Sequence, residues 1–417
     1  MPTLLKQRTE NSPGIITFTI NEVLWGVVHK SKKVRDYINE TSKASEWIYG
    51  VHFNGYYSQP WPFESWQSFI MFPDTAISFL ALVPPQNLTP LTCLNFLPDS
   101  ILSLRGLQKE WDICVISRPS EIKRITETLY LLRELLNLKP DLKVVMVVPD
   151  PRKLELGEKA YFNEVDRNFF ELPKTLFSCN ELRNNLSFIC SSQPAFGNFP
   201  VSNDLVCEFM ARSKFLLLTS HSEGGPRVVA EAFLAGTPCI VSNNLKSGIQ
   251  KFLTTENTIF IDDDANIGAQ QVLDGLCNYE RYNIDQDWAR TNFSEATFIP
   301  QLRDYLSRQI RSRNLPVEGE WYLNDLHLRL PCHGQKNNYQ FMNNETLFFD
   351  WIEKINCLNG REPSEDFLFG SAPLSDAPIP QEVSLIDSLK GRLYTSWRMM
   401  HAAQNKVKMI VGFRNDT

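Results

Sequence analysis

Short apolar segments alternate with longer amphipathic segments through the middle of the chain. The runs DICVISR at 112–118 and KVVMVVP at 143–149 are largely apolar, which is typical of strands buried on both faces of a parallel sheet. Between them, residues 121–137 repeat apolar side chains at helical spacing. Further strands are predicted at 186–190, 215–220, 238–242 and 258–262, with helices over 202–212 and 226–235. The pattern predicts an α/β domain with a doubly wound parallel sheet, whose ligands lie at the carboxyl ends of its strands.

The regions on either side of this alternation differ from it. Residues 1–110 are rich in Trp, Tyr, Phe and Pro and contain one clear strand pattern, IITFTI at 15–20. The stretch 361–382 is rich in proline and is typical of a linker or a long loop. We therefore predict a reduced or atypical N-terminal domain (1–110), the doubly wound domain (111–310) and a C-terminal extension (311–417).

One segment of the predicted extension is strongly basic. Residues 389–414 carry six lysines and arginines and no acidic residue, and their large apolar side chains fall at helical spacing. Such a helix can lie on an anionic membrane surface, which would place the protein at the inner face of a membrane. The alternative is a helix that packs on a domain and exposes its basic face to solvent.

Composition narrows the class of protein. The chain has 417 residues, a formal net charge of −6 and a pI near 5.7, which argues against nucleic acid as its main partner. Its nine cysteines form no CxxC pair, so we expect a reducing compartment rather than a disulfide framework. The N-terminus has no signal-peptide pattern and the chain has no run of about eighteen apolar residues, so we expect a cytoplasmic protein.

The stretch SHSEGGPRVVAEAFLAGTPCIVS at 220–242 carries the clearest chemistry. Glu223 lies in the loop that follows a predicted strand, and Glu231 lies on the short helix that follows the loop. Between them, Gly224 and Gly225 permit positive φ and close approach of the backbone to a ligand. We expect Glu231 to lie off the apolar face of this helix.

The start of that helix predicts an anion site. Free N–H groups near Gly225–Arg227 and the helix dipole favour a phosphate group. Two carboxylates beside a phosphate must bond to something else, and sugar hydroxyls are natural donors to a carboxylate. Eight residues at helical rise span roughly 12 Å, the scale that separates the two sugars of a nucleotide diphosphate sugar. Glu223 then meets the transferred sugar and Glu231 the ribose.

The whole run resembles a known signature. S-x-x-E-G-G-P followed by E-A-F-L-A-G-T-P-C-I-V-S is similar to the motif of the family-four glycosyltransferases, which are retaining enzymes with the two-domain GT-B fold. The resemblance extends to VISRPSEIKRITETLYLLREL at 115–135 and to the segments at 257–276 and 289–306. It covers about residues 112–310 and implies a Rossmann-like domain that binds the donor.

The resemblance also implies roles for residues. Arg118 and Lys123 match the arginine and lysine that bind the donor diphosphate, and Glu223 matches the residue that orients the donor sugar. Glu231 would hold the ribose, while four neighbours would line the phosphate and sugar: Gly224, Gly225, Arg227 and His221. For His221, an exposed loop histidine is an equal alternative. The implied reaction moves a hexosyl group to a glycan or lipid-linked hydroxyl with retention, and it needs no metal or other cofactor.

Other candidate sites have simpler interpretations. Asp262, Asp263 and Asp264 follow a predicted strand and indicate a turn rather than a metal site. Cys332-His333 lacks a second ligand pair at zinc spacing. The aromatic segment 52–69 can stack on sugar rings or form the core of a small domain, and we favour the core.

The first 110 residues depart from the family pattern. They are about half of what precedes the donor domain in the family, and they lack its Gly-rich loop. The family places a histidine near the reacting sugar, and here His29 and His52 are candidates, although a structural histidine is favoured for each. Our hypothesis is that residues 311–417 cross back and complete this domain. The alternatives to a transferase are a non-catalytic scaffold that binds nucleotide sugars and a nucleotide-sugar epimerase of the same fold.

Overall fold

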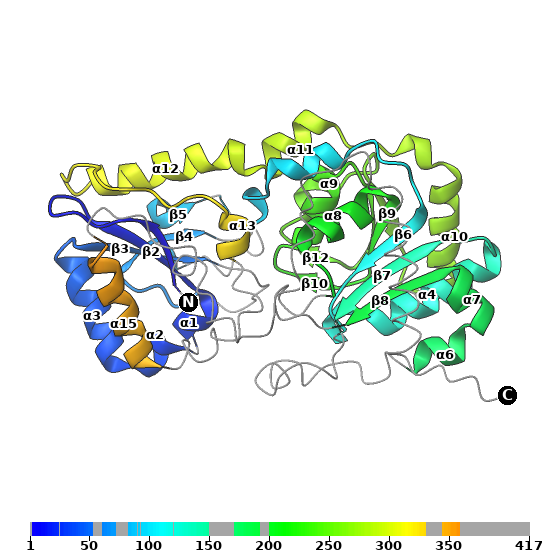
Figure 1. Ribbon diagram of the computed structural model, residues 1–417, viewed down its shortest axis with the longest axis horizontal. Coiled ribbons are helices and arrows are strands. Elements are labelled where there is room, and N and C mark those ends of the chain that lie inside the picture. The colour runs from blue at the N-terminus through cyan, green and yellow to red at the C-terminus, as the bar shows by residue number, and fades with distance from the viewer. Residues whose placement is uncertain are drawn as a thin grey trace, which may run out of the picture.

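The protein folds into two α/β lobes (Figure 1). The computed structural model describes residues 2–24, 26–52, 61–71, 82–89, 91, 93–119, 121–149, 171–191, 200–330 and 344–358. The proline-rich stretch 361–382, the basic segment 389–414, Cys332-His333 and Tyr57 lie outside these residues. Within them, no helix is long and apolar enough to cross a membrane.

The second lobe is built on a six-stranded parallel sheet. In chain order its strands are β6 (Trp111–Ile116), β7 (Val144–Pro149), β8 (Leu186–Ser191), β9 (Ser213–Leu218), β11 (Cys239–Ser242) and β13 (Thr258–Ile261). Their order across the sheet is β13-β11-β9-β6-β7-β8. The apolar segments predicted as strands are thus confirmed, and the inner strands β6, β7, β9 and β11 are almost entirely buried between two layers of helices.

The strand order reverses between β6 and β9. These two strands are neighbours, but the chain continues from β6 to β7 on one side and from β9 to β11 on the other. The loops that leave their carboxyl ends therefore diverge, and such a point is where doubly wound sheets bind ligands.

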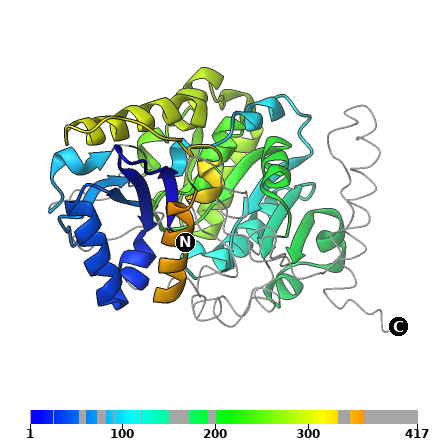
Figure 2. The same cartoon turned by 60° about the vertical axis from the view of Figure 1, so that its left-hand side comes forward.

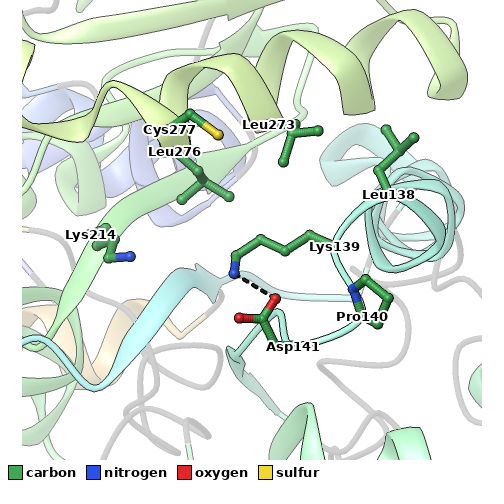
Figure 3. A pocket seen from close by; sticks show the side chains of 8 residues that line it. All are labelled: Leu138, Lys139, Pro140, Asp141, Lys214, Leu273, Leu276 and Cys277. Carbon is green, nitrogen blue, oxygen red and sulfur yellow. Dashed lines mark hydrogen bonds and ion pairs between the residues drawn. The ribbon is translucent and has the colours of Figure 1, made fainter.

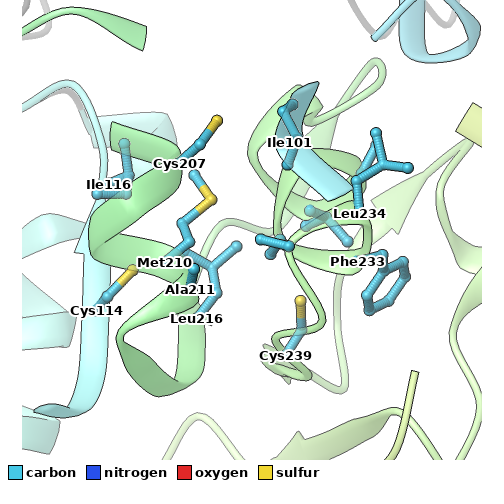
Figure 4. Packing of buried hydrophobic residues seen from close by; sticks show 14 of the residues in the cluster. Ile101, Cys114, Ile116, Cys207, Met210, Ala211, Leu216, Phe233, Leu234 and Cys239 are labelled. Atoms are coloured by element: carbon cyan, nitrogen blue, oxygen red, sulfur yellow. The ribbon is translucent and has the colours of Figure 1, made fainter. Parts of the chain in front are cut away.

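Helices cover both faces of this sheet. On one face α4 (Ile125–Leu138) packs beside α10 (Ala265–Cys277), and on the other α8 (Asn203–Ala211) and α9 (Arg227–Leu234) share a core with α11 (Gln286–Phe293). Figure 4 shows Met210, Phe233 and Leu234 in that second core. The edge beyond β8 carries α6 (Leu172–Leu176) and α7 (Cys179–Asn184).

The cysteines at 114, 179, 190, 207, 239, 277 and 357 are free thiols. Three of them, Cys114, Cys207 and Cys239, belong to the core drawn in Figure 4. Burial raises the pKa of Cys114 to about 12. These thiols are therefore packing groups rather than nucleophiles.

The first lobe contains more regular structure than its sequence indicates. Its five strands are β1 (Thr3–Lys6), β2 (Gly14–Thr19), β3 (Trp47–His52), β4 (Gln67–Met71) and β5 (Leu88–Thr89). They pair in that order, with β1 antiparallel to β2 and the rest parallel. Only β2 was predicted. β3 is as long as β2, but its sequence WIYGVH is aromatic and interrupted by glycine. Gly50 is needed there, since a Cβ atom would lie 2.1 Å from the ring of Phe69.

The C-terminal part of the described chain completes this lobe (Figures 1 and 2). One face of the sheet is covered by α1 (Ile20–Leu24), α2 (Val27–Lys30), α3 (Lys32–Lys43) and α15 (Glu345–Asn356). The other face is covered by α12 (Glu295–Arg311) and α13 (Leu326–Arg329). The chain also pairs along β1, where the Tyr322 N–H donates to the Leu5 carbonyl at 2.9 Å. Residues 295–330 and 344–358 thus pack on the first lobe, so this contribution begins at α12, before the residue 311 at which the hypothesis placed it.

The first lobe owes its stability to an aromatic core. Trp61 and Trp66 are 0% and 2% exposed and pack with Phe18, Tyr49 and the α15 side chains. The core interpretation of the aromatic segment is therefore correct for these two residues.

The two connections between the lobes are joined to each other. A β-bridge links Leu97 to Ser294, with the Leu97 N–H donating to Phe293 and the Glu295 N–H donating to Leu97. Arg105 then donates to the carbonyls of Phe233 and Leu234 at 2.8 and 2.9 Å. It thereby satisfies the last carbonyls of α9, the helix that carries Glu231.

The remaining short elements of the described residues are six 3-10 helices and one pair of two-residue strands. They are η1 (Pro85–Asn87), η2 (Cys93–Asn95), η3 (Asp99–Leu104), η4 (Glu121–Lys123), η7 (Gln250–Phe252), η8 (Tyr279–Arg281), and the strand pair β10 (Ser222–Glu223) and β12 (Lys246–Ser247).

His52 is a structural histidine that should make stability depend on pH. It is 1% exposed, and its ring bonds Thr17 Oγ1 at 3.0 Å and the Leu330 carbonyl at 2.7 Å. Burial lowers the pKa of His52 from 6.5 to about 4. Between these values the unfolded chain binds a proton that the folded chain does not, so stability should fall by up to about 3 kcal/mol as pH drops through this window.

Urea midpoints at pH 7 and pH 5 would measure this loss. We expect His52→Gln to lose less stability than the wild type between the two pH values, since it does not titrate. Equal losses in both proteins would contradict the assignment.

Candidate functional site

Three loops meet at the carboxyl edge of the second sheet. They follow β6, β9 and β13, and they carry Arg118, the segment Thr219–Glu223 and Asp263 respectively. Side chains from the β6 loop contact both other loops, as described below. The site therefore coincides with the reversal of strand order.

Lys123 and Glu223 form an ion pair across this edge. The Lys123 ammonium donates to Glu223 Oε1, and the two side chains are 26% and 10% exposed. One lies on η4, after β6, and the other on β10, after β9. The fold thus brings together a cation and a carboxylate that are 100 residues apart in sequence.

The backbone around Glu223 is held by a small strand pair. Ser222 and Glu223 of β10 pair with Lys246 and Ser247 of β12. The Lys246 N–H also donates to the carbonyl of His221 at 2.8 Å. Glu223 is therefore placed by strand pairing and not by a loose loop.

Of the two glycines of the motif, Gly225 has a clear packing role. Neither Gly224 nor Gly225 uses the positive φ that glycine permits. A Cβ atom at Gly225 would lie 3.2 Å from the side chain of Leu94, and η2 packs there. The glycine lets the linker between the lobes approach the start of α9.

Glu231 is buried, contrary to the expectation that it lies off the apolar face. It is 2% exposed, and its Oε1 accepts a bond from Arg227 Nη2 at 3.0 Å. Arg227 lies one turn earlier on α9, so the i,i+4 geometry supplies the partner. Arg227 Nη1 also donates to the carbonyl of His327 on α13 at 2.7 Å, which joins the two lobes beside Glu231.

Two further residues of the site, Asp263 and Arg124, were missed in the sequence analysis. Asp263 accepts bonds from Arg124 Nη1 at 2.6 Å, Ser242 Oγ at 2.8 Å and Asn244 Nδ2 at 2.6 Å. It also contacts His221 Nε2 at 2.7 Å. Burial tends to raise the pKa of Asp263, but the bonds from Arg124, Asn244 and Ser242 hold it well below its usual value. Asp263 is thus an ionised centre of the cluster and not only a turn residue.

Asp264, by contrast, fits the turn interpretation. Its side chain accepts from Asn266 and Ile267 as the N-cap of α10. Three consecutive aspartates gave no signal that separates the middle one from its neighbours.

The remaining predicted residues have simpler positions. Arg118 lies half-buried directly after β6, next to Ser117. His29 is exposed on α2, and His52 is the structural histidine described above. Within the described chain, no group of three or more His, Cys, Asp or Glu side chains is arranged to hold a metal ion.

A separate hollow lies at the other end of this sheet. Its volume is about 310 Å³, and Figure 3 shows Lys139 and Asp141 at its wall beside Leu273, Leu276 and Cys277. These residues follow α4 or end α10, near the amino ends of β6 and β7. The hollow is therefore remote from the charged cluster, whose chemistry identifies the candidate site more directly than cavity size does.

The sequence of this edge matches a known family. Residues 198–271 match the model of the family described as Glycosyl transferases group 1. The match includes His221, Glu223, Arg227, Glu231 and Asp263. No curated protein matches the sequence at a significant level.

Solved structures resemble the chain at low identity. HepE from Anabaena, in complex with UDP and glucose, is 16% identical with a TM-score of 0.42, over 70% of this chain and 71% of that one. An α,α-trehalose 6-phosphate synthase from Burkholderia multivorans is 12% identical with a TM-score of 0.47, over 65% and 68%. The pneumococcal O-GlcNAc transferase GtfA, in complex with UDP and GlcNAc, is 12% identical with a TM-score of 0.44, over 66% and 55%. These likenesses are too distant to assign a substrate.

Proposed function

We propose that this chain, whose residues 198–271 match the Glycosyl transferases group 1 family, moves a hexosyl group from a nucleotide diphosphate sugar to a hydroxyl of a glycan or lipid-linked acceptor. The anomeric configuration is retained in this proposal, as the family resemblance implies. The bond from the anomeric carbon to the diphosphate breaks and its electron pair leaves with the nucleoside diphosphate. The acceptor oxygen forms the new bond, and its proton passes to a phosphate oxygen of the leaving group.

The observation that carries the proposal is the meeting of Lys123 and Glu223 at the switch point of the sheet. A leaving diphosphate gains negative charge, which Lys123 and Arg118 would stabilise in place of a metal ion. The carboxylate of Glu223 would accept hydroxyl bonds from the donor sugar. Donor binding must then replace their mutual ion pair with bonds to the two halves of the donor.

Glu231 is the proposed ribose ligand. Its Oε1 is occupied by Arg227, and its Oε2 makes no hydrogen bond within the described residues. A ribose hydroxyl can therefore reach Oε2 without displacing the arginine. His221, Gly224 and Gly225 would line the path between the ribose and the transferred sugar.

The acceptor would enter between the lobes. The link from Arg227 to α13 brings the first lobe to the edge of the donor site. The described part of this lobe is a five-stranded α/β unit, which supports an acceptor-side domain over a scaffold that lacks one.

A donor panel tests the proposal. We would incubate the protein with nucleotide sugars and a mixed pool of glycan acceptors, and follow release of free nucleotide. One donor should support release, and Arg118→Ala and Glu231→Ala should each lower the rate by roughly 100-fold or more. Release that needs no acceptor and changes the sugar would favour an epimerase. A thermal shift with nucleotide but no release would favour a scaffold.

A further inference from the structure

We propose that Arg124 is a third basic residue that binds the donor diphosphate, together with Arg118 and Lys123. The inference rests on the proposed function and assigns a binding role to a residue outside the motif. Three features of Arg124 support it: its backbone conformation, the fixation of its guanidinium and its position beside Lys123.

The backbone of Arg124 is strained. Its φ of 51° and ψ of 45° place it in the left-handed region, directly before α4. Among the described residues, the other non-glycine positions with positive φ are Ser45, Asn314 and Asp325. Asn and Asp tolerate this region, whereas a long side chain gains nothing from it. Glycine would fit this position better, so the arginine is retained against local preference, which points to a use for its side chain.

The turn itself does not need the side chain. The Arg124 carbonyl accepts from Thr128 N at 3.0 Å, Thr128 Oγ1 at 3.1 Å and Thr219 Oγ1 at 3.2 Å. These three bonds hold the backbone, and none of them involves the guanidinium. A glycine at this position would keep all of them.

The guanidinium of Arg124 is held in place, but not all of its N–H groups have a hydrogen-bond partner within the described residues. Nη1 donates to Asp263 at 2.6 Å and contacts His221, and Nε lies 3.4 Å from Glu127. The side chain is 16% exposed. Nη2 makes no hydrogen bond within the described part of the chain, and it is not sealed from solvent. One edge of the arginine is thus held by Asp263, and the other edge is open to a ligand.

This open edge lies beside the proposed diphosphate site. Arg124 contacts His221, and its neighbour Lys123 contacts Glu223, two residues further along the same loop. The two cations therefore flank one short loop at the switch point. A guanidinium matches two phosphate oxygens at once, whereas an ammonium acts as a point charge, so the pair would hold the diphosphate and its orientation.

Arg124→Gly separates a binding role from a structural one. Isothermal titration of the full chain would use UDP, GDP and ADP, with the matching nucleosides and inorganic pyrophosphate as further probes. For the nucleoside diphosphate that binds, we expect affinity to fall by roughly 10- to 100-fold. Pyrophosphate should weaken likewise, nucleoside affinity should not change, and the melting temperature should stay or rise because the strain is relieved. Arg124→Lys should lose less affinity than Arg124→Gly.

Asp262→Asn is the matched control. Asp262 is next to Asp263 but accepts only within its own turn, from the Asp264 N–H at 2.8 Å. The Asp262→Asn variant should bind every probe with the affinity of the wild type. Unchanged affinity in Arg124→Gly, or an equal loss for nucleoside and nucleoside diphosphate with a lower melting temperature, would overturn this inference alone. A wild-type protein that binds no nucleoside diphosphate would overturn the proposed function with it.

Discussion

Glu223→Gln should nearly abolish sugar transfer and yet tighten the binding of the free nucleoside diphosphate. The structure pairs Glu223 with Lys123, so the carboxylate competes with the diphosphate for the ammonium. Glutamine removes that competition, and Lys123 becomes available to the phosphates. The same change removes the charged acceptor for the sugar hydroxyls, which should lower kcat/KM by roughly 100-fold or more. Initial rates and isothermal titration with the cognate nucleoside diphosphate would measure the two effects.

The opposite signs of these effects make the test specific. A general disturbance of the site would weaken both transfer and binding. Glu280→Gln is a matched control, because Glu280 is an exposed glutamate of η8 and should change neither. If nucleoside diphosphate binds more weakly to Glu223→Gln than to the wild type, the ion pair is not the resting state of the donor site.

The second large effect is expected at the buried pair on α9. Glu231→Leu alone leaves Arg227 without its carboxylate partner, and Arg227→Met alone leaves a buried negative charge. Arg227→Met should destabilise the protein by about 3–5 kcal/mol, the usual cost of leaving a buried charge unpaired. Glu231→Leu should cost less, because the Arg227 side chain is 22% exposed and keeps its bond to the His327 carbonyl. The double change removes both charges and should recover most of that loss. Urea unfolding midpoints of the four proteins would measure it.

Activity should not follow stability in this series. If Glu231 binds the donor ribose, the double variant is folded but lacks the carboxylate that binds the ribose. Its rate of transfer should therefore remain low. Its KM for the nucleotide sugar should rise more than that of Arg105→Lys, a variant that disturbs the end of α9 and the bond to the Ile284 carbonyl but no proposed donor ligand. A double variant that regains both stability and transfer would reduce Glu231 to a structural residue.

Short-range patterns account for what was predicted correctly. The six strands of the second sheet and helices α4, α8 and α9 lie within a few residues of their predicted bounds, because each is a local run of apolar or periodic residues. Helices α6 and α7 were not predicted. The start of α9 was displaced by one residue, since Pro226 takes an extended conformation and caps the helix instead of beginning it. Predictions from local sequence patterns failed in the first lobe, where β3 and β4 are stabilised by pairing with strands that are distant in the sequence.

The residues of the candidate site likewise fall into two groups, those that the sequence identified and those that it did not. Glu223, Glu231, Arg118 and Lys123 were identified from motif residues and their resemblance, and their roles remain proposals. Arg124 was missed because nothing in the sequence predicts that this arginine adopts the left-handed backbone conformation. Asp263 was hidden because its partner Arg124 lies 139 residues away.

By itself, the sequence determined the doubly wound sheet and the elements that bear the motif residues, because alternating apolar segments can satisfy their burial in few other ways. Only the tertiary structure decided that Glu231 is buried against Arg227, that Lys123 meets Glu223, and that Asp263 holds Arg124. Each of these depends on how loops from separate strands converge at one edge. That convergence is set by strand order and packing, which no local stretch of residues encodes.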